Sequence, residues 1–278
     1  MDALYNAAKP RVVAIGGPTA TGKTALSVAL AKRFGGEIIS ADSMQIYQGL
    51  DVGTAKVTPE EMQGVPHHLV GFLAPEQAFS VADFTTLAGK TITQLTAQGK
   101  LPLVVGGTGL YITSLLNGIG FTPEKVDPAI RQELQARLQA EGSQALYAEL
   151  AAVDPGYAAK VHPNNTPRVI RALELYRATG RKMSAEREAA RPAEKPYRSL
   201  CLCLTCRDRT LLYQRIDTRC DRMMQSGILE EAKLVYDHRD TYRTAAQAIG
   251  YKEFFPYFER TASLEACADK LKQASRNY

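Results

Sequence analysis

The strongest constraint on the fold is a glycine-rich turn near the start of the chain. Before it, Arg11–Ile15 is a short apolar run typical of a buried parallel strand. After it, Ala25–Phe34 is rich in Ala and Leu and ends at a glycine pair, which indicates a helix. The turn itself reads Gly17-x-x-x-x-Gly22-Lys23-Thr24, which fits the P-loop pattern in the strand–turn–helix setting that the pattern requires. The combination predicts an α/β core with a parallel sheet.

This turn is suited to hold a diphosphate or a triphosphate. Its glycines allow backbone N–H groups and the helix N-terminus to face an anion. Lys23 adds positive charge near the terminal phosphates, and the Thr24 hydroxyl is placed to ligate Mg²⁺. We therefore predict that the phosphates of a ligand contact the residues of this loop: Gly17, Pro18, Thr19, Ala20, Thr21, Gly22, Lys23 and Thr24.

Two further apolar runs predict strands of the same sheet. Glu37–Ser40 leads into Asp42, and Leu101–Val105 leads into Gly106-Gly107-Thr108. P-loop kinases and ATPases usually place an Asp at such a strand end to support Mg²⁺, and Leu101–Val105 has none. Asp42 is the available acid, and we expect it at the tip of the strand that neighbours the P-loop strand. It is a candidate metal-supporting group, a candidate base for a nucleophile, or a turn cap.

From about residue 121 the pattern becomes helical. Two helix starts are marked by a capping aspartate followed by proline, Asp127-Pro128 and Asp154-Pro155, and Thr166-Pro167 opens a further helix. Ser199–Thr205 then alternates like a core strand that returns the chain to the sheet. We predict a P-loop NTPase-like core formed by 1–120 and 196–278, the latter with C-terminal helices. A mostly helical insertion at 121–195 interrupts it.

Composition and charge narrow the class of protein. The 278 residues are 45% hydrophobic and 23% charged, which excludes a disordered chain. No apolar run approaches the roughly 18 residues that a membrane helix needs, and the first residues do not resemble a secretory signal. Five cysteines do not suggest a disulfide framework. We expect a cytoplasmic protein, a monomer without membrane contact.

The charge is unevenly distributed. Residues 1–120 carry 8 basic and 8 acidic side chains, whereas 160–200 carry 10 basic and only 4 acidic ones. The basic stretch indicates either a polyanion-binding surface or a solvated helical face. The pair Cys203-x-x-Cys206 has a metal-like spacing, but no second Cys or His pair follows nearby. We therefore expect these cysteines in the core and not at a zinc site.

Seen together, these motifs resemble one family, the tRNA dimethylallyltransferases, also called tRNA isopentenyltransferases. The matching segments occur in the family's order across nearly the whole chain. They are Gly17–Thr24, Asp42–Tyr47, Asp51–Lys56, His67–Leu69, Val105–Tyr111, His162–Arg168, Arg171–Glu174 and Gly250–Glu253.

The resemblance implies transfer of a dimethylallyl group from dimethylallyl diphosphate to N6 of the adenosine on the 3′ side of a tRNA anticodon. The P-loop then holds a leaving diphosphate with Mg²⁺, although ATP can occupy the same loop. The resemblance implies catalytic roles for Asp42, as the base on the amine, and for Thr108 and Lys23. It also implies a diphosphate contact from Arg219, with Arg215 and Arg222 as alternatives.

The target base lies within the stacked anticodon loop, so it must be flipped out to reach Asp42. The resemblance implies an anticodon stem-loop as partner. It places these residues along the RNA path: Asp42, Ser43, Met44, Gln45, Thr108, Arg131, Arg168, Arg171, Gln247 and Lys252.

Three other readings remain open at this point. A P-loop small-molecule kinase would turn over ATP and would need a second acid near the sheet. An adenylate isopentenyltransferase would act on free nucleotides, and the basic 160–200 stretch argues against it. A tRNA-binding protein without activity is disfavoured by the intact Lys23, Thr24, Asp42 and Thr108.

Overall fold

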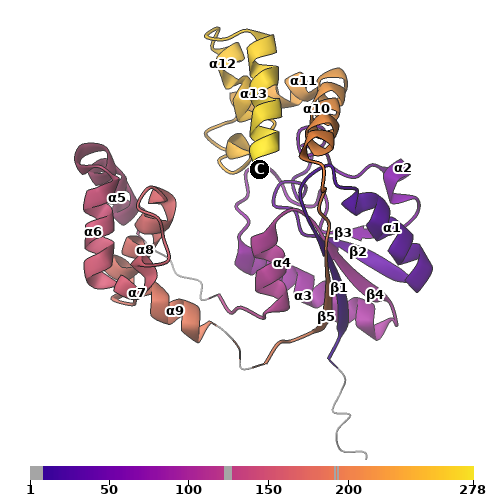
Figure 1. The fold of residues 1–278 in the computed structure, drawn as a ribbon, viewed down its shortest axis with the longest axis horizontal. Coiled ribbons are helices and arrows are strands. Elements are labelled where there is room, and N and C mark those ends of the chain that lie inside the picture. Colours follow the sequence, from indigo (N-terminus) through magenta and orange to yellow (C-terminus); the bar gives the residue numbers. More distant parts are fainter. Residues whose placement is uncertain (1–8, 122–126, 191, 193) are drawn as a thin grey trace, which may run out of the picture. The chain divides into compact units, whose positions relative to one another are not determined.

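The computed structural model describes residues 9–121, 127–190, 192 and 194–278 (Figure 1). The chain forms two compact units. The core unit comprises Met1–Leu116 and Lys195–Tyr278, and the helical unit comprises Asn117–Glu194. These bounds lie within a few residues of the predicted insertion.

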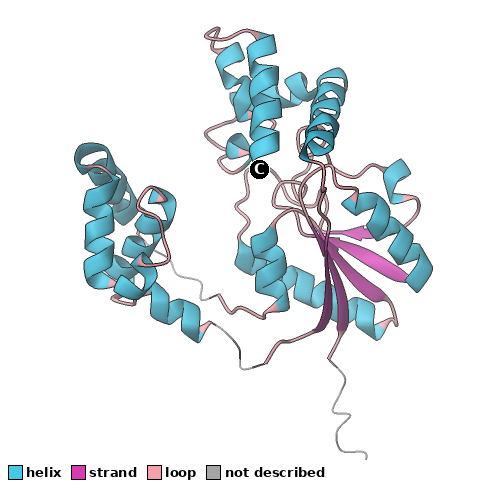
Figure 2. Ribbon diagram, in the orientation of Figure 1, coloured by secondary structure: helices cyan, strands magenta, loops and turns pink. Residues whose placement is uncertain are grey.

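The core unit is built on a five-stranded sheet (Figure 2). Its strands are β1 (Arg11–Gly16), β2 (Gly36–Ser40), β3 (His67–His68), β4 (Leu101–Val105) and β5 (Arg198–Cys203). All neighbours pair in parallel, in the order β3-β2-β4-β1-β5. The expectation that Asp42 follows the strand beside the P-loop strand was wrong. β4 lies between β1 and β2, because the chain crosses over through α3 (Val81–Ala97) before it returns to the sheet.

Helices cover both faces of this sheet. Ile38 of β2 clusters with Val28 of α1 (Lys23–Phe34), whereas the next residue, Ile39, clusters with Phe84 of α3. This alternation follows from the two-residue period of a strand, so successive side chains enter opposite layers. α4 (Gly109–Leu116) joins α3 on its side of the sheet. The layers confirm the predicted α/β core of the P-loop NTPase type.

β5 departs from the expected core strand. It pairs only with β1 at the edge of the sheet, and both Cys201 and Cys203 are exposed. Only Leu202 and the following Leu204 pack against the core. An edge strand pairs on one side only, and fewer helices pack over it than over a central strand. The alternation of apolar and polar residues in Ser199–Thr205 therefore did not indicate a buried strand. Among the described residues, no group of three His, Cys, Asp or Glu side chains could hold a metal ion.

The C-terminal part of the core unit is helical, as predicted. It contains α10 (Arg209–Gln225), α11 (Ile228–Asp237), η1 (Ala245–Gln247), η2 (Lys252–Phe254), α12 (Phe255–Phe258) and α13 (Leu264–Asn277). These elements share an apolar cluster with Ile46, Tyr47 and Leu50, which lie in the loop after β2. The short α2 (Pro59–Met62) follows that loop. The loop after Asp42 is therefore packed between the sheet and the C-terminal helices.

The helical unit has its own apolar core. Its helices are α5 (Pro128–Glu141), α6 (Ser143–Val153), α7 (Pro155–Ala158), α8 (Thr166–Thr179) and α9 (Met183–Ala189). The two predicted aspartate caps are present: Asp127 accepts a hydrogen bond from the Ala129 N–H, and Asp154 accepts one from the Tyr157 N–H. α8 begins at Thr166 as expected, but its N-cap residue, Asn165, makes no side-chain cap hydrogen bond. Leu134 and Leu173 are fully buried between these helices. In the described part of the chain, no helix is long and apolar enough to span a bilayer.

Candidate active site at the carboxyl ends of the strands

The P-loop backbone takes conformations that explain its glycines. Gly17 has φ +145°, and a Cβ there would lie 2.4 Å from the Leu204 carbonyl oxygen. Gly22 has φ +87° and directly precedes α1, whose first turn contains no acidic residue. The positive end of the α1 dipole therefore faces the loop without a carboxylate in its own first turn.

Lys23 is folded back onto its own loop. Its Nζ donates hydrogen bonds to the carbonyl oxygens of Gly17, at 2.8 Å, and Pro18, at 2.7 Å. The ammonium group therefore lies over the loop that would receive phosphate oxygens. Thr21 closes the same turn, because its hydroxyl donates to the Pro18 carbonyl at 2.8 Å.

The ends of β1, β2 and β4 are joined by backbone hydrogen bonds. The Ala41 N–H donates to the Val105 carbonyl at 2.8 Å, and the Thr108 N–H donates to the Ala41 carbonyl at 3.2 Å. The side chain of Thr108 completes the link, since its Oγ1 accepts a hydrogen bond from the Ser43 N–H at 3.2 Å. Gly106 leaves no room for a side chain, because a Cβ would lie 2.1 Å from the Ala41 carbonyl oxygen. Thr108 and the residues after β2 therefore share one fixed corner.

Asp42 stands at this corner with one oxygen engaged. Its Oδ1 accepts hydrogen bonds from the N–H groups of Met44, at 2.9 Å, and Gln45, at 3.2 Å. Among the described residues, Oδ2 has no hydrogen-bond donor. The turn is therefore capped by one oxygen while the other stays available to a ligand. The sequence left two roles for Asp42 as alternatives, a cap of the turn and a general base. One carboxylate can fill both, because each role uses a different oxygen.

Three charged side chains act on one another across the site. Burial, together with the nearby Arg219 guanidinium, lowers the pKa of Lys23, while the Asp42 carboxylate opposes this. Burial also lowers the pKa of Arg219, and Asp42 again acts in the opposite direction. Arg215 and Arg222, the two alternatives in α10, are exposed. The geometry therefore favours Arg219 as the arginine that accompanies Lys23.

Two tyrosines border Asp42 and were not singled out from the sequence as site residues. Burial, with smaller effects from Tyr47, Asp42 and Asp83, raises the pKa of Tyr111 to about 12. Tyr111 also stacks on Phe84, with ring centroids 4.4 Å apart. Tyr278, just after α13, lies within interaction range of the Thr108 hydroxyl and Asp42. No local pattern in the sequence indicates that the end of α13 returns to this corner.

The residues present fit a Mg²⁺ ion held mainly by its substrate. The Thr24 side chain is exposed at the first turn of α1, and its hydroxyl oxygen makes no hydrogen bond within the described part of the chain. Mg²⁺ prefers oxygen ligands and usually keeps several waters while binding substrate phosphates. One hydroxyl beside a phosphate-binding loop suits that arrangement.

The helical unit presents the predicted RNA-binding arginines in a specific way. Glu174 is buried, with 4% of its side chain exposed, and it pairs with Arg131 at 2.6 Å and with Arg171 at 3.2 Å. Arg168 is exposed and has no ion pair among the described residues. That Glu174 joins the two arginines was not predicted, although its i+3 spacing from Arg171 is evident in the sequence. Arg191, also in the basic stretch, lies outside the described residues.

The other predicted RNA contacts lie in the core unit. Gln247 and Lys252 are exposed on either side of the buried Gly250-Tyr251 pair. Ser43 and Met44 are half-buried at the Asp42 turn. The Gln45 side chain is engaged within the protein and does not offer its Nε2 to RNA, because Nε2 donates to the Thr54 and Ala55 carbonyls at 3.3 and 2.9 Å.

Comparison with known proteins gives a consistent result. The family model described as IPP transferase matches residues 45–278, and the one described as isopentenyl transferase matches residues 10–70. A tRNA dimethylallyltransferase from Bacillus subtilis (strain 168) is 49% identical over 273 residues, which cover 98% of this chain and 86% of that protein.

Solved structures agree with these matches. The full-length tRNA isopentenylpyrophosphate transferase of Bacillus halodurans is 45% identical, with a TM-score of 0.68, covering 97% of this chain and 84% of that chain. A eukaryotic dimethylallyltransferase acting on tRNA is 32% identical, with a TM-score of 0.78, covering 96% of this chain and 67% of that chain.

Proposed function

The chain belongs to the tRNA dimethylallyltransferase family, and we propose that it transfers a dimethylallyl group from dimethylallyl diphosphate to tRNA. The acceptor is N6 of the adenosine on the 3′ side of the anticodon. The new bond joins N6 to C1 of the allyl group, the C1–O bond breaks, and diphosphate leaves. One observation carries this assignment: Asp42 has a carboxylate oxygen that no donor among the described residues occupies, and it lies near the charges of Lys23 and Arg219.

The P-loop is proposed to hold the diphosphate. The loop amides and the α1 N-terminus face the anion, while Lys23 exchanges its two carbonyl partners for phosphate oxygens. Arg219 adds a second positive charge on the same site. These groups are in place before the C1–O bond breaks, so they stabilise the charge that develops on the leaving group.

Mg²⁺, held by Thr24 and the diphosphate, would supply further neutralisation of the leaving group. The Thr108 hydroxyl, fixed by the Ser43 N–H, is proposed to donate a hydrogen bond to the diphosphate. Neither role requires an acid at the end of β4, where Gly106 packs against the Ala41 carbonyl.

Asp42 is proposed to act as the general base. An adenine N6 amine is a weak nucleophile, because its lone pair is delocalised into the ring. A carboxylate oxygen that accepts one N6 proton as the C–N bond forms removes the resulting positive charge. Oδ2 can accept that proton while Oδ1 keeps the Met44 and Gln45 N–H groups.

The RNA partner is proposed to be the anticodon stem-loop with the target base flipped out. In the helical unit, Arg168 and Arg171 project into solvent from the start of α8, where they can bind phosphates. A free nucleotide would need no such surface, which supports tRNA over an adenylate acceptor. The monomeric state and a cytoplasmic location stay predictions.

The test is an incubation of the protein with dimethylallyl diphosphate, Mg²⁺ and an anticodon stem-loop RNA that carries the target adenosine. We expect prenylated adenosine by mass spectrometry, and no product from the same RNA with guanosine at that position. A parallel reaction with AMP separates an adenylate acceptor from an RNA acceptor. Steady ATP hydrolysis coupled to phosphorylation of a small acceptor would favour the kinase instead.

A further inference from the structure

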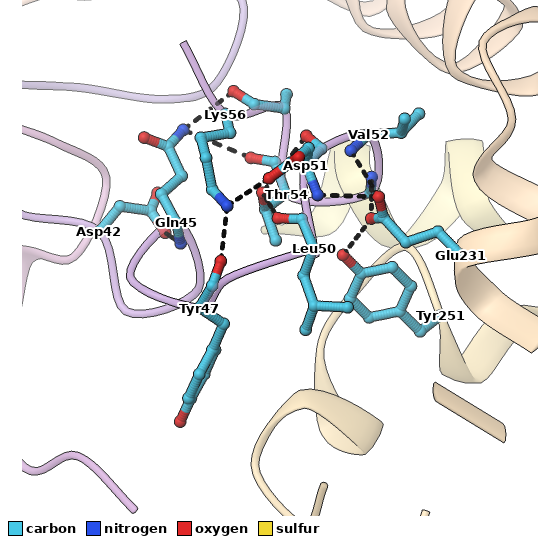
Figure 3. Close-up of polar contacts among 12 residues, drawn as sticks. Asp42, Gln45, Tyr47, Leu50, Asp51, Val52, Thr54, Lys56, Glu231 and Tyr251 are labelled. Carbon is cyan, nitrogen blue, oxygen red and sulfur yellow. Dashed lines mark hydrogen bonds and ion pairs between the residues drawn. The ribbon is translucent and has the colours of Figure 1, made fainter. Parts of the chain in front are cut away.

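A glutamate on α11 binds a turn that is far from it in the sequence. The two oxygens of Glu231 accept three consecutive backbone N–H groups: those of Asp51 at 2.8 Å, Val52 at 2.9 Å and Gly53 at 2.9 Å (Figure 3). The Tyr251 hydroxyl donates a fourth hydrogen bond to the same carboxylate at 2.5 Å. Hydrogen bonds to a charged acceptor are roughly twice as strong as neutral ones, so this carboxylate holds the turn firmly.

Close packing holds the same turn from another side. A Cβ on Gly53 would lie 2.4 Å from Cε1 of Tyr251, so the ring rests directly on the glycine backbone. A Cβ on Gly250 would lie 2.9 Å from the Gly53 carbonyl oxygen. The turn is therefore held by Glu231 and by the Gly250-Tyr251 pair. The contact between this pair and Gly53 leaves no space for a side chain at Gly53 or at Gly250.

The opposite side of the turn is connected to the candidate active site. The Thr54 and Ala55 carbonyls accept the two hydrogen bonds from Gln45 Nε2 (Figure 3). The backbone N–H of Gln45 in turn donates to Asp42 Oδ1 at 3.2 Å. Hydrogen bonds and the covalent chain of the turn and of Gln45 thus connect Glu231 to the proposed base.

We propose that Glu231 is a positioning residue for prenyl transfer, acting through the Asp51–Ala55 turn and Gln45 on the orientation of Asp42. This inference rests on the proposed function, and in particular on Asp42 as the base. Glu231 touches no substrate in this scheme. Its role requires an acceptor with two oxygens, because N–H groups converge on both of them.

Glu231→Gln tests this requirement with little change in shape. A glutamine offers one acceptor oxygen, and its NH₂ group would face N–H donors. Glu230→Gln is the matched control, because Glu230 is the other acid in the first turn of α11 and is exposed. Both variants lose the same favourable interaction with the helix dipole, but only Glu231→Gln disrupts the turn.

The measurement is single-turnover prenyl transfer to the stem-loop RNA, expressed per site that binds dimethylallyl diphosphate. For Glu231→Gln we expect a rate constant lower by roughly 10- to 100-fold, the size of effect that a small misplacement causes. Donor affinity should stay within about twofold, because the P-loop is untouched. Glu230→Gln should match the wild type in both quantities. Amide hydrogen exchange at Asp51–Gly53 should accelerate in Glu231→Gln alone.

Two results would overturn the inference: an unchanged rate constant in Glu231→Gln, or a rate that falls only in proportion to the donor-binding sites lost. Tyr251→Phe covers the case in which Glu231→Gln does not fold. It keeps the ring on Gly53 and removes one donor, so we expect a few-fold slower transfer, and an unchanged rate would contradict the scheme. Absence of product with the wild type would refute the proposed function itself, whereas only the ratio between variant and wild type tests the positioning role.

Discussion

Replacing Asp42 with Asn separates the two tasks of this side chain. Its Oδ1 caps the turn by accepting the Met44 and Gln45 N–H groups, and an asparagine oxygen can accept both of them. The amide nitrogen would then stand in the place of Oδ2, and an amide nitrogen cannot accept a proton from N6. We expect the thermal stability to change little, while the rate constant for prenyl transfer falls by about 10²–10⁴-fold. That loss corresponds to roughly 3–5 kcal/mol of activation free energy.

The assay is single-turnover transfer, with donor binding measured in parallel, both across a series of Mg²⁺ concentrations. Donor affinity should survive in the variant, because Lys23, Arg219 and the loop amides are unchanged. A role for Asp42 in holding Mg²⁺ makes the opposite prediction, since donor affinity would then fall and added Mg²⁺ would restore it. Near-normal turnover in Asp42→Asn, or full rescue by Mg²⁺, would refute the assignment as base.

Three further predictions follow from the site and its surroundings. First, kcat/KM for the donor should fall as pH rises through the pKa of Lys23, because a neutral amine no longer attracts diphosphate. Since Arg219 helps to lower that pKa, Arg219→Gln should move the alkaline midpoint of the kcat/KM profile to higher pH, besides weakening donor binding. Second, Arg168→Ala should weaken binding of the stem-loop RNA and reduce the slope of log K against log salt by about one phosphate contact, with donor affinity unchanged in titrations. Third, Gly106→Ala should destabilise the fold by about 1–3 kcal/mol in denaturant titrations, because its Cβ would meet a backbone carbonyl at 2.1 Å. Gly109→Ala, where a Cβ would meet nothing within 4 Å, should leave the midpoint nearly unchanged.

The central strands and the phosphate loop were predictable because their signals are local. Buried parallel strands are continuous apolar runs, and the loop glycines are demanded by the backbone around an anion. The order of the strands was not predictable in the same way. The residues of β2 and β4 do not indicate which strand each of them pairs with. For that reason the expectation that Asp42 follows the strand beside the P-loop strand was wrong.

The candidate site shows the same division. The loop residues were predicted from the P-loop motif, whereas the roles proposed for Asp42 and Thr108 came from the family resemblance. The resemblance favoured Arg219, and the packing of α10 supports it over Arg215 and Arg222, because both of those are exposed. The role of Glu231 could not be predicted from the sequence, because three of its four donors are backbone N–H groups about 180 residues away.

The edge position of β5 has a consequence for biosynthesis. Arg11 of β1 pairs with Arg198 of β5, so one side of β1 stays unpaired until the chain has been synthesised as far as β5. Pairings across such long loops form slowly, whereas the helical unit consists of one continuous segment, Asn117–Glu194, that is synthesised before β5. Gly17 obtains the Leu204 backbone against which it packs only after that step. A nascent chain thus carries the P-loop sequence well before it can form the complete loop, which requires residue 204 to have been synthesised.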